Sequence, residues 1–182
     1  MFHSFHCSSK SIHINILSVY MKDQEYYFHQ TPPELCLDLI EFVPIQYGDT
    51  AYEPFRGEGA FYNALRKKTP HVEWSEIEEG RDYKDFSGNV DHIVTNPPFQ
   101  EKGSFWKILN RLTDTSQKSI SLLGNQYCFT SLTPKRLKLI ENKGFYLTKI
   151  VICNIKKWYG KYFFMIFTRD KNEAFEYLEG SY

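Results

Sequence analysis

Apolar and polar positions along the chain predict short strands separated by helices. Residues 90–94 form a β-branched run, and residues 119–123 form a second apolar run of strand length. The segment 50–68 predicts a short strand, a glycine turn and a helix, and residues 71–77 predict the next strand. Residues 147–155 and 162–169 predict two strands of an antiparallel hairpin. Strands that alternate with helices indicate an α/β domain with a mostly parallel sheet.

Three further segments carry helical patterns. Thr31 is predicted to cap a helix, with Pro32 at its first position and Glu34 at capping-box spacing. Residues 105–112 predict a helix, and Thr133 followed by Pro134 opens another, with Gly144 just beyond its end. The apolar stripes of the first and last of these helices are Leu35, Leu37, Leu39, Ile40 and Val43, and Leu137, Leu139 and Ile140.

A stiff turn follows the strand at residues 90–94. Its sequence is Thr95-Asn96-Pro97-Pro98-Phe99, and two consecutive prolines end a β-ladder. The amide oxygen of Asn96 and the carbonyl of Pro97 are acceptors suited to the two hydrogens of an exocyclic amino group, and Phe99 suits stacking on a flat ring. The alternative is a strand-ending turn with a buried phenylalanine.

A glycine turn and several acids precede that turn in the chain. Gly57 and Gly59 allow the backbone to approach a ligand after Glu53, although a lone G-x-G is a weak signal. Glu76 lies about twenty residues further on, where an acid often binds ribose hydroxyls, unless it is simply one of several surface glutamates. Asp82 and Tyr83 follow, an acid and an aromatic ring that suit adenine. No P-loop lysine is present, which argues against a nucleoside triphosphate.

Net charge is zero, but the two signs are segregated along the chain. Residues 34–101 carry fourteen acids and six bases, whereas residues 131–171 carry ten bases and two acids. The basic, aromatic tip between the last two predicted strands suits phosphate contact and base stacking, or places its aromatic rings in the core. Its residues are Lys156, Lys157, Trp158, Tyr159 and Lys161.

Composition excludes several classes of protein. The aromatic fraction of 17% indicates an ordered core, and no apolar run is long enough to cross a membrane. Four scattered cysteines without a CxxC pair indicate reduced thiols and a cytoplasmic location. His3, His6 and Cys7 lack a fourth ligand, so no metal site is expected. Residues 1–20 predict a loose N-terminal extension, and residues 21–182 one domain.

The order of these motifs resembles the class I S-adenosylmethionine-dependent methyltransferases. More narrowly, the chain resembles the enzymes that methylate the 6-amino group of adenine in DNA, over residues 27–169. The motifs that carry the resemblance are residues 31–33, residues 53–59 and the Asn-Pro-Pro-Phe turn, and Glu53 stands where aspartate is commoner. The resemblance implies a Rossmann-like, seven-stranded sheet with helices on both faces and S-adenosylmethionine as cofactor.

The resemblance also implies roles for individual residues. Asn96, Pro97, Pro98 and Phe99 would form the catalytic turn, with the base flipped out of the duplex. The tip residues would contact DNA, and a specificity partner or second subunit is expected because a large target-recognition region is missing. The residues implied at the cofactor are Thr31, Pro32, Glu53, Pro54, Phe55, Gly57, Gly59, Glu76, Asp82, Tyr83 and Asn96.

Three other functions stay open from the sequence. An RNA amino-methyltransferase would use the same turn, and 2′-hydroxyl contacts cannot be identified in the sequence. A protein methyltransferase acting on a glutamine amide faces the same NH2 chemistry. An inactive binding module with the cofactor fold is the third alternative, although such a module has no need of the turn at residues 95–99.

Overall fold

The computed structural model describes residues 30–98, 104–156 and 158–175. The chain divides into two compact units, residues 1–30 and residues 31–182. The expected boundary near residue 20 and the cluster of His3, His6 and Cys7 lie outside the described residues. Within the described ranges no helix is long and apolar enough to cross a membrane, and no group of three candidate metal ligands gathers.

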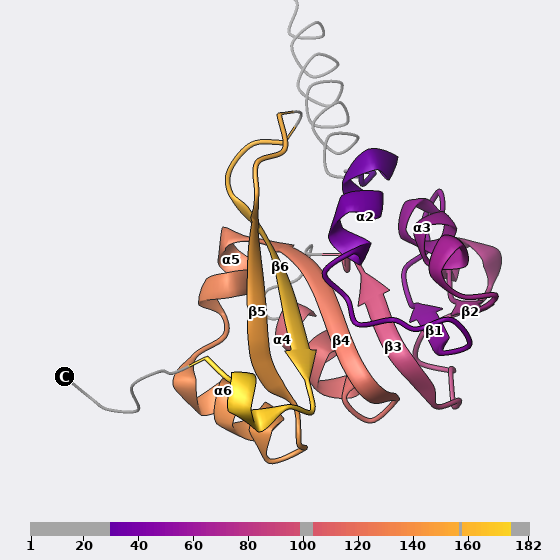
Figure 1. Ribbon diagram of the computed structural model, residues 1–182. Coiled ribbons are helices and arrows are strands. Elements are labelled where there is room, and N and C mark those ends of the chain that lie inside the picture. The colour runs from indigo at the N-terminus through magenta and orange to yellow at the C-terminus, as the bar shows by residue number, and fades with distance from the viewer. Residues whose placement is uncertain (1–29, 99–103, 157, 176–182) are drawn as a thin grey trace, which may run out of the picture. The chain divides into compact units, whose positions relative to one another are not determined.

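The described part of residues 31–182 is built on one mixed sheet of six strands (Figure 1). The strand order is β2-β1-β3-β4-β6-β5, with β2, β1, β3 and β4 mutually parallel and β6 antiparallel to both β4 and β5. The strands are β1 (Thr50–Glu53), β2 (His71–Trp74), β3 (Val90–Thr95), β4 (Ser116–Asn125), β5 (Tyr146–Cys153) and β6 (Tyr162–Thr168).

Helices cover both faces of this sheet. On one face α2 (Pro33–Ile40) and α3 (Ala60–Lys68) contribute to an apolar cluster that includes Ala51, Val94 and Phe164. On the other face α4 (Ser104–Leu112) and α6 (Pro134–Glu141) pack on a second cluster that includes Tyr52 and Ile93. Alternate residues of β1 and β3 thus point to opposite layers, as strand geometry requires.

The predicted strands and helices are largely confirmed, with three differences. The sheet has six strands in the described part, where the family resemblance implied seven, and the strand expected over residues 71–77 ends at Trp74 because the 3₁₀ helix η2 (Ile77–Glu79) follows it. The five-residue helix α5 (Gln126–Thr130) was not predicted; Asn125 caps it by accepting from the amide of Cys128 at 3.1 Å. A last 3₁₀ turn, η3 (Lys171–Glu173), follows β6.

Two helix details were wrong. Thr31 does not cap α2, because Pro32 occupies the N-cap position and no side chain of the described residues caps the helix. Leu139 was expected in the apolar stripe of α6, but it is 47% exposed and only Leu137 and Ile140 are buried there. The start of α6 was predicted correctly, since the Thr133 hydroxyl accepts from the amide of Arg136.

A buried polar network ties three strands together at the amino ends of β1 and β3. His92 is fully buried, with Nδ1 2.7 Å from Ser119 Oγ and Nε2 3.0 Å from Asp49 Oδ2. Lys118 bridges the carboxylates of Asp49 and Asp91. Asp91 in turn accepts hydrogen bonds from the amide and hydroxyl of Thr50. The network fixes the amino-terminal ends of these strands relative to one another.

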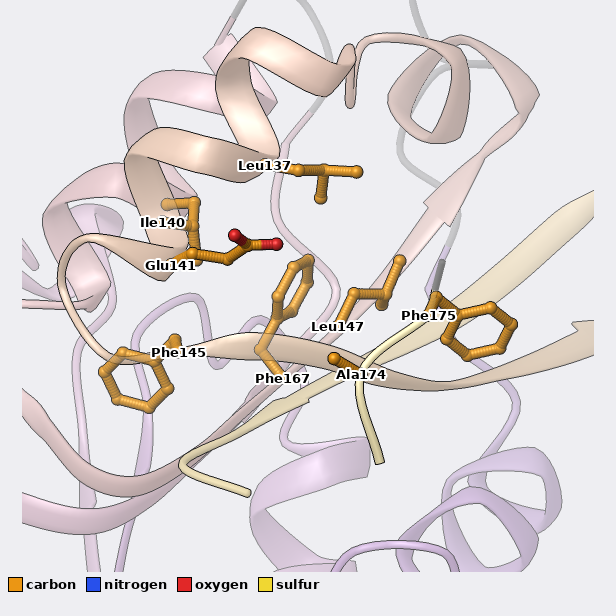
Figure 2. Close-up of a pocket in the computed structure, with 8 residues that line it drawn as sticks. All are labelled: Leu137, Ile140, Glu141, Phe145, Leu147, Phe167, Ala174 and Phe175. Carbon is orange, nitrogen blue, oxygen red and sulfur yellow. The ribbon is translucent and has the colours of Figure 1, made fainter. Parts of the chain in front are cut away.

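A small apolar crevice lies at the same edge as that network (Figure 2). It is lined by Leu137, Ile140, Glu141, Phe145, Leu147, Phe167, Ala174 and Phe175. The amide of Phe175 donates to the carbonyl of Leu147 at 2.8 Å, which holds the end of the described chain against β5. Its lining residues come from α6, the start of β5 and the end of β6, so the crevice is separate from the edge that carries the sequence motifs.

Candidate active site

The carboxyl ends of β1 and β3 form the topological switch point of the sheet. After β1 the chain passes into α3, which packs on one face, and after β3 into α4, which packs on the other. Ligands of open α/β sheets bind beyond the strand ends at such a point. The sequence motifs at Glu53 and Asn96 sit at these two ends, as expected.

Glu53 ends β1 as a buried acid, 1% exposed. Its Oε1 accepts from the amide of Phe55 at 3.1 Å, and burial raises the pKa of the carboxyl to about 8 despite that hydrogen bond and the nearby Thr95 hydroxyl. Thr95 Oγ1 itself has no hydrogen bond of ordinary geometry among the described residues. A cation brought to this place would therefore meet a carboxyl that no base of the described chain neutralises.

The glycine turn and Glu76 come together as the sequence predicts. Gly57 and Gly59 have φ angles of +50° and +87°, which favour glycine. The amide of Gly57 donates to Glu76 Oε2 at 2.6 Å, and the amide of Glu78 donates to Oε1 at 3.3 Å. Each carboxylate oxygen retains a further lone pair, so Glu76 can still accept from two hydroxyls of a ligand.

Asp82 and Tyr83 lie in the loop after η2. The Tyr83 ring packs on Phe55, with centroids 4.6 Å apart, which brings the loop against the turn that follows β1. Asp82 Oδ1 accepts from the amide of Lys84 at 3.0 Å, so part of its acceptor capacity stabilises its own turn. Of Asp82 and Tyr83, it is therefore Tyr83 whose side chain connects the loop to the glycine-turn segment.

Two arginines and a tryptophan beside this loop were missed by sequence reasoning. The guanidinium carbons of Arg56 and Arg81 lie 4.0 Å and 3.9 Å from the ring centroid of Trp74. Arg56 also forms an ion pair with Glu79. The only sequence signal was the position of Arg56 within the glycine turn, since cation–π pairing between residues far apart in sequence has no local pattern.

Asn96 follows β3, and its side chain has a hydrogen-bond acceptor without a donor among the described residues. Its Nδ2 donates to Thr31 Oγ1 at 3.1 Å, whereas its buried Oδ1 has no hydrogen-bond partner among the described residues. Pro97 is buried and Pro98 is exposed, as the turn leaves the sheet. Phe99 lies outside the described residues. A buried amide oxygen without a donor is uncommon and marks a position where a ligand N–H can bind.

The loop between β5 and β6 emerges at the same edge as Asn96. Thr95 pairs with Leu122, Asn125 pairs with Tyr162, and Tyr162 pairs with Cys153, so the described residues 154–156 and 158–161 lie beyond the carboxyl end of β4. This register brings the described residues of the predicted basic tip to the edge where Asn96 follows β3, and Figure 1 shows the loop beyond β5 and β6 on that side.

The side chains of this loop divide between surface and core. Trp158 is 8% exposed and packs on Tyr162 with centroids 4.7 Å apart, so of the two placements open from the sequence the core one is correct. A stacking role for Trp158 is therefore withdrawn, because its ring is covered. Tyr159 is fully exposed, and Lys156 and Lys161 are exposed as well. Lys157 lies outside the described residues.

A second exposed aromatic residue at this edge was not predicted. Tyr127 belongs to α5, directly after β4, and is 84% exposed. It was overlooked because α5 itself, a helix of five residues, carries too short a pattern to be recognised. With Tyr159 it puts two tyrosine rings at the surface of the edge where β4 ends and β6 begins.

Comparison with known proteins defines the fold. No protein-family model matches the chain, and no curated protein is significantly similar in sequence. Solved structures do match. The modification subunit of a candidate type I restriction enzyme from Vibrio vulnificus has a TM-score of 0.60 and 16% identity, over 91% of this chain and 51% of that one.

Two further structures differ in their substrates. A candidate RNA methyltransferase from Pyrococcus horikoshii has a TM-score of 0.58 and 20% identity, over 77% of this chain and 86% of that one. Magnesium protoporphyrin IX methyltransferase from Synechocystis, solved with bound S-adenosylmethionine, has a TM-score of 0.55 and 7% identity, over 91% and 87%. The chain spans about half the length of several matched structures. The likeness shows a methyltransferase Rossmann-like α/β fold.

Proposed function

We propose that the chain is an S-adenosylmethionine-dependent methyltransferase that modifies the exocyclic 6-amino group of adenine in DNA. The observation that carries the proposal is the Oδ1 atom of Asn96 at the switch point of the sheet, which is buried and has no partner among the described residues. An amino group supplies the N–H donor that this acceptor lacks.

The residues at the end of β1 and in the turns that follow fit the cofactor. Its ammonium group would meet the buried carboxyl of Glu53, and its ribose hydroxyls would meet Glu76 beside the glycine turn. When bound, the cofactor supplies a methyl group on a sulfonium, which is a good leaving group. The residues proposed to hold it are Pro32, Glu53, Pro54, Phe55, Gly57, Gly59, Glu76, Asp82 and Tyr83.

The chain's own contribution to the chemistry is positioning and hydrogen bonding. Asn96 Oδ1 and the carbonyl of Pro97 accept the two amino hydrogens and help to localise a lone pair that is otherwise delocalised into the base. No strong base is needed, because the amino proton becomes acidic only after the new bond forms. Pro98 stiffens the turn, and Phe99 is proposed to stack on the base.

The nucleic acid is proposed to lie over the β4–β6 side of the edge. Lys156 and Lys161 are exposed there, with Lys157 between them in sequence, and Tyr159 adds an exposed ring. Lysines suit phosphates, and an exposed tyrosine suits stacking on an unpaired base. A duplex base must be flipped out to reach Asn96. The Vibrio modification subunit, which has the same fold, is consistent with a DNA substrate.

RNA is the second candidate substrate. The structure of the Pyrococcus candidate RNA methyltransferase is matched over most of its own length, whereas only half of the Vibrio subunit is matched. The acceptor at Asn96 would serve an RNA adenine equally well, because the 6-amino group is the same in both nucleic acids.

The test offers cofactor with a radiolabelled methyl group to duplex DNA, single-stranded DNA, RNA and protein. We expect label in DNA, and we expect Asn96→Ala to abolish transfer while cofactor binding by calorimetry is retained. Label in RNA alone would favour the second candidate. Label in protein alone, or in none of the polymers, would reject a nucleic-acid methyltransferase.

A further inference from the structure

The hydroxyl of Thr31 is committed to Asn96 and not to the helix that follows it. α2 begins at Pro33 with Pro32 in the N-cap position, and no side chain of the described residues caps it. Thr31 is 8% exposed, and its Oγ1 accepts from Asn96 Nδ2 at 3.1 Å, across 65 residues of sequence. A buried threonine that makes a long-range bond to the catalytic turn has a role beyond helix formation.

The bond pairs one end of the Asn96 amide and leaves the other end without a partner among the described residues. A side-chain amide carries its acceptor and its donors on opposite sides of one carbon. With Nδ2 directed at Thr31, Oδ1 is the atom that remains, and it is buried without a partner among the described residues. The reverse orientation would leave an NH2 group at the site instead.

We propose that Thr31 is a positioning residue: its hydroxyl holds the Asn96 side chain through Nδ2 and leaves Oδ1 to accept from the amino group to be methylated. This inference rests on the proposed function. An amino group donates hydrogen bonds, so a flipped Asn96 would set donors against donors and would fail to bind the nitrogen that must be methylated.

The sequence motif suggested a different role, in which Thr31 touches the cofactor. The two roles predict different effects of removing the Thr31 hydroxyl. If Thr31 binds the cofactor, removal of its hydroxyl raises the dissociation constant of the cofactor. If Thr31 positions Asn96, removal of the hydroxyl lowers kcat and leaves that constant unchanged, because Asn96 Oδ1 acts on the target amino group.

The kinetic test uses Thr31→Val, which keeps the shape of the side chain and removes the hydroxyl, and Thr31→Ser, which keeps the hydroxyl. We expect Thr31→Val to lower kcat about tenfold, the effect of one hydrogen bond, with the cofactor dissociation constant within about twofold. Thr31→Ser should restore most of kcat.

Thr133→Val is the matched control, because Thr133 is also a threonine before a proline but caps α6. It should lower thermal stability and leave kcat unchanged. Unchanged kcat in Thr31→Val would overturn the proposal, as would a weaker cofactor affinity with normal kcat. Equal reductions of kcat in Thr31→Ser and Thr31→Val would also overturn it, because the hydroxyl would then not be responsible.

A second readout does not depend on methyl transfer and so separates this inference from the proposed function. The side-chain amide of Asn96 gives a pair of proton–nitrogen NMR signals, identified by their disappearance in Asn96→Ala. Thr31→Val should shift this pair and speed its exchange with solvent, whereas Thr31→Ser and Thr133→Val should not. An unmoved pair in Thr31→Val would refute the positioning bond even if the enzyme methylates DNA. If the pair shifts but the protein methylates no amino group, the Thr31–Asn96 bond is supported and the proposed function is rejected.

Discussion

Two buried side chains at one sheet edge lack partners of the kind they need within the described chain. Glu53 is a buried carboxyl with no cation beside it there, and Asn96 Oδ1 is a buried acceptor with no donor among the same residues. Such groups are costly in a fold and cluster at functional sites. One needs a positive charge and the other an N–H group, which are the features of the proposed cofactor and substrate.

If Glu53 meets the ammonium group of the cofactor, as proposed, cofactor binding releases a proton. Its pKa of about 8 keeps the free carboxyl mostly protonated at pH 7, and a cation held beside it lowers that pKa. We expect binding at pH 7 to release most of one proton and the affinity to rise with pH up to about 8. Calorimetry in phosphate and in Tris, whose ionisation enthalpies differ, measures the release.

Glu53→Gln, which cannot ionise, is the control and should give the same heat in both buffers. Equal heats for the unmodified protein would contradict the assignment.

In the absence of ligand, Glu53 also makes the stability of the fold depend on pH in a defined direction. Between about pH 4.5 and 8 the folded state holds a proton on Glu53 that the unfolded state has released, so this group lowers stability as pH rises.

Sequence reasoning singled out Asn96, Gly57 and Glu76 as candidates because each carries a local signal, a Pro-Pro turn or a spacing from a glycine. The Thr31–Asn96 bond has no such signal, because it joins residues 65 positions apart. The neighbours Trp158 and Tyr159 were treated alike in the sequence, yet one is in the core and the other on the surface. Composition cannot tell which of two adjacent aromatic residues faces inward.

Among the helices, two threonine–proline starts behave differently for a physical reason. At α6 a single proline follows Thr133, so the helix begins at once and the hydroxyl caps it. Before α2 two prolines follow Thr31, and the second forces the first out of helical geometry, with φ −57° and ψ 130° at Pro32. The helix begins one residue later, which places Thr31 outside it and leaves its hydroxyl for Asn96.

The network at the amino ends of the strands predicts a loss of stability in acid. Burial lowers the pKa of His92 below its ordinary value of about 6.5, although the neighbouring Asp49 opposes the shift. The unfolded state therefore binds a proton near pH 6.5 that folded His92 does not bind. This contribution to the free energy of unfolding is complete above that pH and declines as pH falls below it.

Urea unfolding at several pH values between about 5 and 7.5 measures this effect. Relative to His92→Gln, which does not titrate, the unmodified protein should lose stability more steeply as pH falls. The exposed His71 provides the control substitution, His71→Gln, which should retain the steep decline. Identical pH slopes for the unmodified protein and His92→Gln would show that the buried histidine is not what titrates.

A second acid-labile contribution belongs to Asp49. Burial alone would raise its pKa, but hydrogen bonds from Lys118, the Gln46 amide and His92 lower it to about 2. That contribution is present above about pH 3.8 and is lost as pH falls towards 2, so it lies outside the window of the His92 measurement.

Across the whole described domain, the segregated charges have a spatial meaning. The acids around β2 and η2 lie on the side proposed for the cofactor. The basic loop that joins β5 and β6 lies on the other side of the same sheet edge. Other bases of the same stretch are used structurally at the opposite edge. Arg169 donates to the carbonyls of Gln117, Lys143 and Ser116. The basic surplus of the sequence is therefore only partly a surface for nucleic acid.

Lys156 and Lys161 are the described bases of this loop that could hold DNA at the site. We expect Lys156→Ala with Lys161→Ala to weaken binding about equally on all sequences and to flatten the plot of log affinity against log salt by about two units. The matched control, Lys67→Ala with Lys171→Ala, removes the same charge from exposed positions elsewhere. Equal effects of the two pairs in fluorescence-anisotropy titrations would mean that net charge, and not this loop, governs binding.

The central strands of the sheet could be predicted from the sequence more reliably than the segments at its edges. Burial on both faces makes the central strands β3 and β4 apolar runs that the sequence displays plainly. The strand expected over residues 71–77 ends at Trp74, where a 3₁₀ helix and turns follow, and the seventh strand came only from the family resemblance. Exposed edge segments carry little hydrophobic pattern, so sequence reasoning was least reliable at this edge.

The chemical identity of the atom that accepts the methyl group can be measured directly. Duplex DNA is incubated with the protein and S-adenosylmethionine, then digested to nucleosides and analysed by mass spectrometry. We predict N6-methyl-2′-deoxyadenosine with the unmodified protein and none with Asn96→Ala, although that variant binds cofactor normally. A methylated nucleoside other than this one, or the same yield from Asn96→Ala, would contradict the proposed function.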